Sequence, residues 1–200
     1  MASWTRDIPL DSPAYGQGSL EVRLARVEGE LEVRDLVARW VYFHDAGFLA
    51  EKVALHHPDC VIHHHSGDLI GRKDIAAFFA VGPPNDAISD MRHRVTSQTV
   101  RFLSPTRARS FAQYLWAQTV QGPDGPRAAV GGGWYSDVVV LDGEGWCFLE
   151  RTFHRTFDLA LPSVPGFSGL QLGREAVDNA DLERLRRDGV LRTAKGCVDD

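Results

Sequence analysis

Apolar residues recur every three or four positions from Ser19 onward, which is the spacing of one face of an α-helix. The stripe consists of Leu20, Leu24, Val27, Leu31, Val33, Val37, Trp40 and Val41. Ser19 is a favourable N-cap and Gly47 a favourable C-terminal stop, so the pattern predicts one long amphipathic helix, or two helices joined near Gly29. Asp35 and Arg39, four positions apart on the polar side, predict a surface ion pair.

Shorter elements are expected after this helix. A second helix should cover residues 48–56 and end before Pro58, with His56 and His57 acting as capping cations near its end. The next elements are expected to be a strand, a turn and a helix, over residues 60–65, 67–71 and 72–80.

The period changes to that of β-strands from Met91 onward. Four long runs follow, separated by segments rich in Pro, Gly, Ser and Asp that are typical of hairpin turns. They cover residues 91–103, 107–120, 127–141 and 146–158. In the third run, Gly131, Gly132 and Gly133 predict a β-bulge at which the sheet bends, because glycine tolerates bulge geometry. A phosphate-binding loop is not expected there, since a strand rather than a helix follows.

Helices followed by an antiparallel meander predict an α+β fold, in which a curved antiparallel sheet packs one face on the N-terminal helices. We expect residues 19–158 to form this domain, residues 1–18 an N-terminal arm, and residues 159–200 a C-terminal extension with a short helix at about 179–187. A chain of 200 residues can bury enough surface for one core without metal or disulfide staples.

Charge and cysteine content narrow the class of protein. Lys and Arg total 22 against 27 Asp and Glu, a net charge of −5 that offers no broad basic surface to nucleic acid. Neither a secretory signal nor a membrane-spanning segment is expected from the sequence. Cys60, Cys147 and Cys197 are an odd number at wide spacing, which is typical of reduced thiols in a cytoplasm.

These features predict a cytoplasmic protein whose partner is a small molecule, with no nucleic-acid or membrane partner. The outer face of the sheet and the C-terminal extension need cover, so a homo-oligomer, either a dimer or a trimer, is also expected.

Two residues far apart in the sequence are candidates for acid–base chemistry. Asp45 follows the apolar stripe at the end of the long helix, and His93 lies at the start of the first long strand. Each residue alone is more typical of a solvated or hydrogen-bonded side chain. If the fold brings them together, the carboxylate would orient the imidazole and stabilise its cation, as general-base catalysis requires.

A hydrophobic pocket is expected between the sheet and the helices. The second long strand alternates small and aromatic residues on one face, as either a tapered cavity or ordinary core packing would require. These residues are Ala108, Ser110, Ala112, Tyr114 and Trp116. Aromatic walls favour a flat, hydrophobic substrate, and the hydroxyl of Tyr42, Tyr114 or Tyr135 is a candidate donor to a leaving group or an enolate.

A run of three histidines raises the possibility of a metal. Strand alternation places His63 and His65 on one face, so both could meet His93 and Asp45 and bind a metal ion. The alternatives are hydrogen bonding to a substrate in the pocket, or an exposed strand. We expect neither a metal nor another cofactor.

Several short motifs are distinctive as a set. They are Glu32–Trp40, His44–Gly47, Pro58–Cys60, Gly71–Ile75, Arg92–Arg94, Arg107–Ser110, Gly132–Asp137 and Gly145–Phe148. Over about residues 20–158, this set resembles the SnoaL-like members of the nuclear transport factor 2-like superfamily. That superfamily has a cone-shaped α+β fold and includes scytalone dehydratase, bile acid 7-alpha-dehydratase, a lindane dehydrochlorinase and polyketide cyclases.

The resemblance implies a catalytic dyad. In the eliminating enzymes of the family, an Asp at the end of the first helix and a His on the first long strand act together, and Asp45 and His93 match these positions. Trp40 stands where the bile acid dehydratase has a tyrosine, and Arg155 stands about where that enzyme has an arginine near its substrate. The expected pocket residues are Trp40, Tyr42, His63, His65, Tyr114, Trp116, Tyr135 and Arg155.

The expected function is therefore that of a cofactor-independent lyase or isomerase acting on a hydrophobic, aromatic or polycyclic small molecule. Dehydration, another elimination and retro-aldol loss of a small aldehyde would use the same groups. One alternative is a non-catalytic ligand-binding or structural subunit, like the beta chain of ring-hydroxylating dioxygenases, which shares this fold. A metal-dependent enzyme that uses His63 and His65 is the other.

Overall fold

The computed structural model describes residues 18–80, 88–143 and 145–162. The long helix is one helix rather than two, α1 (Leu20–Ala46). The side chain of Ser19 caps its start, and Gly47 ends it with a φ of 76°, in the left-handed region that favours glycine. Asp35 and Arg39 form the expected ion pair, with 2.7 Å between Oδ2 and Nε.

The elements after α1 differ from expectation at their boundaries. The second helix, α2 (Leu49–Ala54), is shorter than predicted, and β1 (His56–His64) runs through Pro58. Pro58 lies within β1 rather than before it. Because proline has no backbone N–H donor, the pairing of β1 with the neighbouring strand is irregular between His56 and Val61. A strand, β2 (Gly67–Ile70), occupies the predicted turn and pairs antiparallel with β1. The helix that follows, α3 (Gly71–Ala80), is the expected one.

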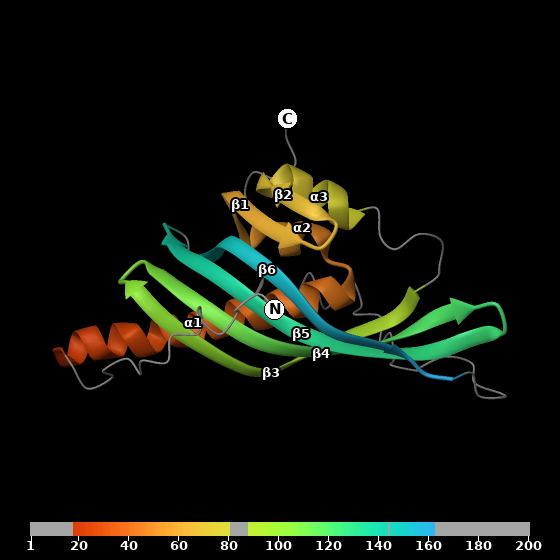
Figure 1. The fold of residues 1–200 in the computed structure, drawn as a ribbon. Helices are drawn as coiled ribbons and strands as arrows, with labels where there is room; N and C mark the ends of the chain where they lie inside the picture. Colours follow the sequence, from red (N-terminus) through yellow and green to blue (C-terminus); the bar gives the residue numbers. More distant parts are fainter. Residues whose placement is uncertain (1–17, 81–87, 144, 163–200) are drawn as a thin grey trace, which may run out of the picture.

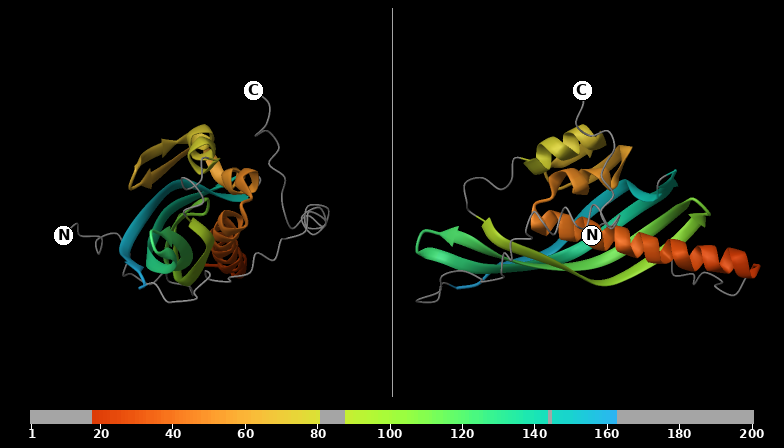
Figure 2. Two further views of the ribbon diagram at one scale, coloured as in Figure 1. Left: turned by 90° about the vertical axis from the view of Figure 1, so that its right-hand side faces the viewer. Right: turned by 180° about the vertical axis from the view of Figure 1, so that it is seen from behind.

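Four long strands joined in sequence by hairpins confirm the predicted meander. They are β3 (Ile88–Ser104), β4 (Arg107–Gly122), β5 (Gly125–Asp142) and β6 (Gly145–Ala160). The strand order is β2-β1-β6-β5-β4-β3, and β1 lies parallel to β6, so the sheet is mixed rather than purely antiparallel. The sheet is curved, α1 runs along it, and β1, β2 and α3 gather at one side (Figures 1 and 2). This is the cone-shaped α+β fold.

One face of the long strands is buried against α1. In β4 the predicted alternating set is buried, namely Ala108, Ser110, Ala112, Tyr114 and Trp116, together with Gln118 and Thr119. On β5 the corresponding face carries Tyr135, whose ring lies 5.8 Å from that of Trp40 on α1. The inner face of the sheet is therefore aromatic where it meets the C-terminal half of α1.

The predicted bulge lies where β5 passes β6. The register between these strands shifts between Gly132 and Gly133. A Cβ atom on Gly133 would collide with the carbonyl oxygen of His154 on β6 and would lie 2.9 Å from the hydroxyl of Tyr114. Close backbone approach therefore requires a glycine at this position.

The arm up to residue 17, the helix expected at 179–187 and Cys197 lie outside the described residues. In the part that is described, Cys60 and Cys147 are free thiols. No helix in that same part combines the length and apolar character needed to cross a membrane.

Candidate active site

The end of α1 and the start of β3 bring Asp45 and His93 into direct contact. Asp45 Oδ1 lies 2.7 Å from His93 Nδ1, and Oδ2 accepts a hydrogen bond from the backbone amide of His93 at 2.6 Å. Both side chains are largely buried, with exposed fractions of 9% for Asp45 and 10% for His93. Because a carboxylate only accepts, it holds the proton of a neutral His93 on Nδ1 and leaves Nε2 with a free lone pair.

Four of the aromatic residues expected in the pocket lie beside this pair, in contact with His93 or with one another. The ring of Tyr114 lies 6.1 Å from that of His93 and stacks on Tyr135 at 4.2 Å. Trp40 contacts Tyr135 in turn, and Trp116 occupies the position directly opposite His93 on β4. Burial raises the pKa of the Tyr114 hydroxyl, so it stays protonated at neutral pH and is available as a donor.

Tyr42 is not part of this group. Its side chain is 43% exposed and its ring contacts Phe43 and Phe48. Tyr42 is two residues from the buried Trp40, which corresponds to about 200° around a helix, so the two side chains leave α1 in nearly opposite directions.

The histidine run also lies apart from Asp45 and His93. His63 Nδ1 is 2.9 Å from Asp68 Oδ1 and Nε2 is 3.6 Å from Glu150, on a strand position where the imidazole is 40% exposed. His65 is exposed, whereas His64 packs its ring against Phe153 of the sheet. The face of β1 that carries the buried Ile62 thus also carries His64, and His63 points the other way.

The structure therefore does not assemble the metal-ligand set that would combine His63 and His65 with Asp45 and His93. Within residues 18–80, 88–143 and 145–162, no group of three or more His, Cys, Asp or Glu side chains is placed to hold a metal ion.

Arg155, expected near the substrate, lies on the surface of β6. Its guanidinium is about half exposed and pairs with Asp158 at 3.0 Å. Its position opposite Gly133 brings it to the bulge rather than into contact with the dyad.

The prediction that His56 is a capping cation is wrong. His56 is fully buried, and burial, with the nearby charge of Arg151, lowers its pKa to about 3. Its Nδ1 lies 3.2 Å from the carbonyl oxygen of Val53, which accepts a hydrogen bond from the neutral ring. His57 is partly exposed and lies 3.8 Å from carboxylate oxygens of both Asp59 and Asp142.

Sequence reasoning missed a buried ion pair beneath the site. Arg151 and Asp137 are both inaccessible to solvent, with 3.0 Å between Nε and Oδ1. The guanidinium carbon lies 4.2 Å from the ring centre of Trp40 and 4.3 Å from those of Tyr135 and Phe148. Burial raises the pKa of the Asp137 carboxyl, and the Arg151 charge acts in the opposite direction. The signal that could have found the pair is Asp137, a charged residue at an inward position between Tyr135 and Val139.

Two further polar residues beside the dyad were also missed. His44 places its ring 5.2 Å from that of His93, and Lys52 of α2 places its Nζ 3.1 Å from His44 Nδ1. Lys52 is only 4% exposed, although it sits on a short helix with no sequence pattern that would mark it as buried.

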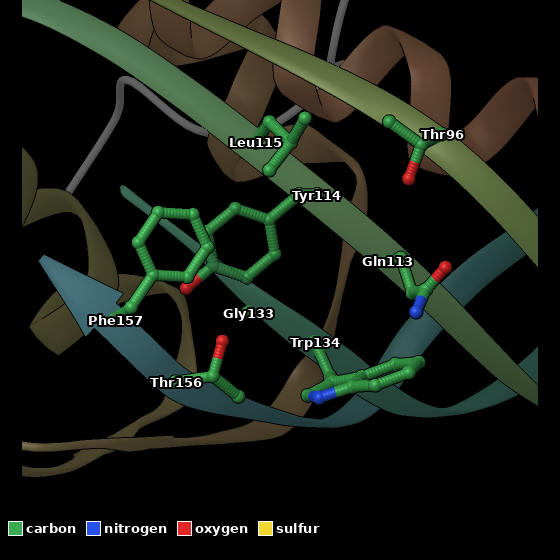
Figure 3. A pocket seen from close by; sticks show the side chains of 8 residues that line it. All are labelled: Thr96, Gln113, Tyr114, Leu115, Gly133, Trp134, Thr156 and Phe157. Carbon is green, nitrogen blue, oxygen red and sulfur yellow. The ribbon is translucent and has the colours of Figure 1, made fainter. Parts of the chain in front are cut away.

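A hollow of about 390 Å³ lies on the opposite face of the sheet from α1. It is lined by Thr96, Gln113, Tyr114, Leu115, Gly133, Trp134, Thr156 and Phe157 (Figure 3). Leu115 and Trp134 alternate along their strands with the inward-facing Trp116 and Tyr135, so this hollow is distinct from the pocket expected between sheet and helices.

Comparison with known proteins agrees with this architecture. A candidate scytalone dehydratase from Novosphingobium aromaticivorans is 17% identical, with 75% of this chain and 99% of that chain covered and a TM-score of 0.60. The hexachlorocyclohexane dehydrochlorinase LinA-type3 from Novosphingobium barchaimii LL02 is 14% identical, covering 72% and 96%, with a TM-score of 0.62. An NTF2-like protein with a cystatin-like fold from Novosphingobium aromaticivorans is 19% identical, covering 73% and 90%, with a TM-score of 0.53. At these identities the likeness concerns the fold.

The chain thus shares the cone-shaped α+β fold of these neighbours, one of which is described as NTF2-like. A family model described as a SnoaL-like domain matches residues 25–152, and the chain belongs to that family. No curated protein matches the chain.

Proposed function

We propose that this protein is a lyase or isomerase that removes a proton from a small hydrophobic molecule, with His93 as the general base. The observation that carries the proposal is the contact between Asp45 and His93, at 2.7 Å between Oδ1 and Nδ1 in a largely buried setting. Nε2 of His93 takes the substrate proton, and the adjacent carboxylate stabilises the imidazolium that forms. Such a base contributes roughly 100- to 10,000-fold to the rate.

Elimination is the reaction class that these groups support best. The candidate scytalone dehydratase and the dehydrochlorinase that share the fold are named for reactions of this class. Loss of water, loss of another small leaving group and retro-aldol release of a small aldehyde all begin with proton removal by a base. None of these steps needs a cofactor, because side chains supply both the base and hydrogen-bond donors.

The substrate is proposed to be aromatic or polycyclic. Trp40, Tyr114 and Tyr135 form a connected set of rings beside His93, and aromatic side chains bind flat apolar molecules through their faces. The hydroxyl of Tyr114, whose raised pKa keeps it protonated, would donate a hydrogen bond to a substrate oxygen.

The test is a screen of aromatic and polycyclic alcohols for release of water or formaldehyde, followed by mass spectrometry. The variant His93→Ala should lose at least about 100-fold of any activity found, since it removes the base. His154→Ala, on the exposed end of β6, is the matched control and should keep wild-type activity. Wild-type turnover by His93→Ala would disprove the role of His93, and tight binding of these alcohols without any turnover would favour a non-catalytic binding protein.

A further inference from the structure

Lys52 is a buried lysine next to the dyad that the proton-abstraction step does not use. Its Nζ lies 3.1 Å from His44 Nδ1 and 3.5 Å from the centre of the Phe79 ring. In the described part of the chain, no carboxylate lies within ion-pair distance of this nitrogen. Burial lowers the pKa of Lys52 from its ordinary value of 10.5 to about 7.

The contact with Lys52 fixes the protonation of His44. When Lys52 is protonated, its ammonium group can only donate, so Nδ1 of His44 accepts and the ring proton of a neutral His44 sits on Nε2. Burial, with the charges of Lys52, His93 and Arg151, lowers the pKa of His44 well below its usual 6.5, which keeps the ring neutral. Stacking on Trp40 at 5.3 Å and an edge contact with Phe79 at 5.6 Å hold the ring in place.

The two neighbouring imidazoles are therefore held in opposite states. Asp45 accepts from His93 Nδ1 and leaves an acceptor on Nε2, whereas Lys52 donates to His44 Nδ1 and leaves a donor on Nε2. Their ring centres are 5.2 Å apart, and the rings meet at 62°. His93 can therefore accept a proton and His44 can donate one, at a separation that a small substrate can bridge.

We propose that His44 is the proton donor of this site and that Lys52 is the residue that positions it and replaces its proton. The inference rests on the proposed function, because it assigns the acid that complements the base His93. As the bond to the leaving oxygen breaks, His44 gives its Nε2 proton to that oxygen and its Nδ1 takes a proton from the Lys52 ammonium group. His93 has meanwhile gained the substrate proton. After product release, His93 loses that proton to water, His44 takes a proton from water at Nε2 and returns its Nδ1 proton to Lys52, so the starting tautomers and charges are restored.

The charged and titratable groups facing this pair come from every element packed on it. They are Asp45 at the end of α1, His93 on β3, Arg151 on β6 and the neutral His56 at the start of β1. Arg151 adds a fixed positive charge, which helps to keep His44 and His56 neutral.

Nitrogen-15 NMR of histidine-labelled protein tests the protonation pattern without any substrate. In the wild type we expect His44 to carry its proton on Nε2 at about pH 6, where Lys52 is protonated. Lys52→Met should raise the pKa of His44 and change its signal, because it removes a neighbouring positive charge. Lys73→Met, at an exposed position of α3, is the control and should leave His44 unchanged. A proton on Nδ1 in the wild type, or an identical His44 signal in Lys52→Met, would overturn the proposal.

Kinetics on a substrate identified by the alcohol screen test the donor role. His44→Phe and Lys52→Met should each lower kcat by about 100-fold while changing KM by only a few-fold, because a general acid acts on the chemical step. Lys52→Arg should preserve the His44 tautomer but not kcat, since a guanidinium donates a hydrogen bond without releasing its proton. Full rescue of kcat by Lys52→Arg would show that Lys52 only positions the ring, and wild-type kcat in His44→Phe would refute the donor assignment.

These outcomes separate the two proposals. A wild-type protein that converts no alcohol contradicts the proposed function and with it the donor role. An active wild type whose His44→Phe variant is equally active contradicts only the assignment of the donor.

Discussion

Asp45 makes two hydrogen bonds to His93, accepting one from the backbone amide at 2.6 Å and one from the ring at 2.7 Å. The first bond fixes the backbone of β3 against the end of α1, and the second fixes the orientation of the imidazole. One carboxylate therefore determines both where the candidate base lies and which of its nitrogens is free. A substitution at this position should affect stability and turnover by separable amounts.

Asp45→Asn tests that separation. The amide keeps the shape of the carboxylate but not its charge, so the imidazolium loses its stabilising partner, and kcat should fall about 100- to 10,000-fold. The free energy of unfolding should fall by about 1–3 kcal/mol, because the charged acceptor of two hydrogen bonds is lost. Steady-state kinetics and urea denaturation measure the two effects. Asp35→Asn, exposed on the same helix, is the control, and an Asp45→Asn enzyme within threefold of wild type would contradict the prediction.

The ion pair between Arg151 and Asp137 predicts a strong coupling in stability. Arg151→Met leaves a buried carboxylate without its partner and should cost about 3–5 kcal/mol. Adding Asp137→Leu removes that charge, so the double variant should be more stable than Arg151→Met alone. Urea denaturation of the full double-mutant cycle measures the coupling. Arg155→Met, in a half-exposed pair, should change stability by less than about 1 kcal/mol, and simple additivity at the buried pair would refute the argument.

The elements of this fold follow from local patterns in the sequence. Ser19 and Gly47 mark the two ends of α1, because helix capping depends on the local sequence. The predicted alternation in β4 is also found, because one face of that strand packs against the core. The predicted boundaries of α2 and β1 are wrong, because Pro58 lies inside a strand and disturbs its pairing rather than ending a helix. The parallel pairing of β1 with β6 joins segments about 90 residues apart in the sequence, and no local sequence pattern indicates it.

Some residues of the candidate site could likewise be predicted from the sequence, and others could not. Asp45 and His93 could be singled out because each lies at the end of a recognisable element and because the family resemblance implies the pair. His63 and His65 were expected beside them, but the orientation of β1 depends on its contacts with α3 and β6. Lys52 is buried only because Phe79 and Trp40 cover it in the folded chain, which its neighbours in sequence do not indicate.

His56 should make the protein less stable as the pH falls. Its pKa is lowered to about 3 in the folded state, so between about pH 6.5 and 3 the unfolded chain binds a proton that the folded chain does not. Above pH 6.5 the neutral state of His56 has no cost in stability. As the pH falls below 6.5, the free energy of unfolding decreases by at most about 1.4 kcal/mol per pH unit.

His56→Gln removes that titration and should flatten the dependence of the unfolding free energy on pH between 4 and 7. His44, whose pKa is also lowered, will keep part of the slope. Urea denaturation at each pH gives the comparison, with His154→Gln at an exposed position of β6 as the control. An unchanged slope in His56→Gln would mean that His56 is already protonated in the folded protein.

Gly133 should be the least replaceable glycine of the sheet, because β6 passes closest to the backbone of β5 there. A Cβ atom would overlap the carbonyl oxygen of His154, which belongs to the backbone and cannot turn aside, so Gly133→Ala should cost about 2–3 kcal/mol or more. The same Cβ would lie 2.9 Å from the hydroxyl of Tyr114, so the ring beside His93 should also shift and turnover should fall.

Gly122→Ala is the control variant. Its Cβ would meet the end of the long Arg127 side chain at 2.9 Å, so the loss in the free energy of unfolding should stay below about 1 kcal/mol. Thermal and urea unfolding of both variants test the ranking, and an equal loss at the two positions would mean that the bulge does not depend on close backbone approach.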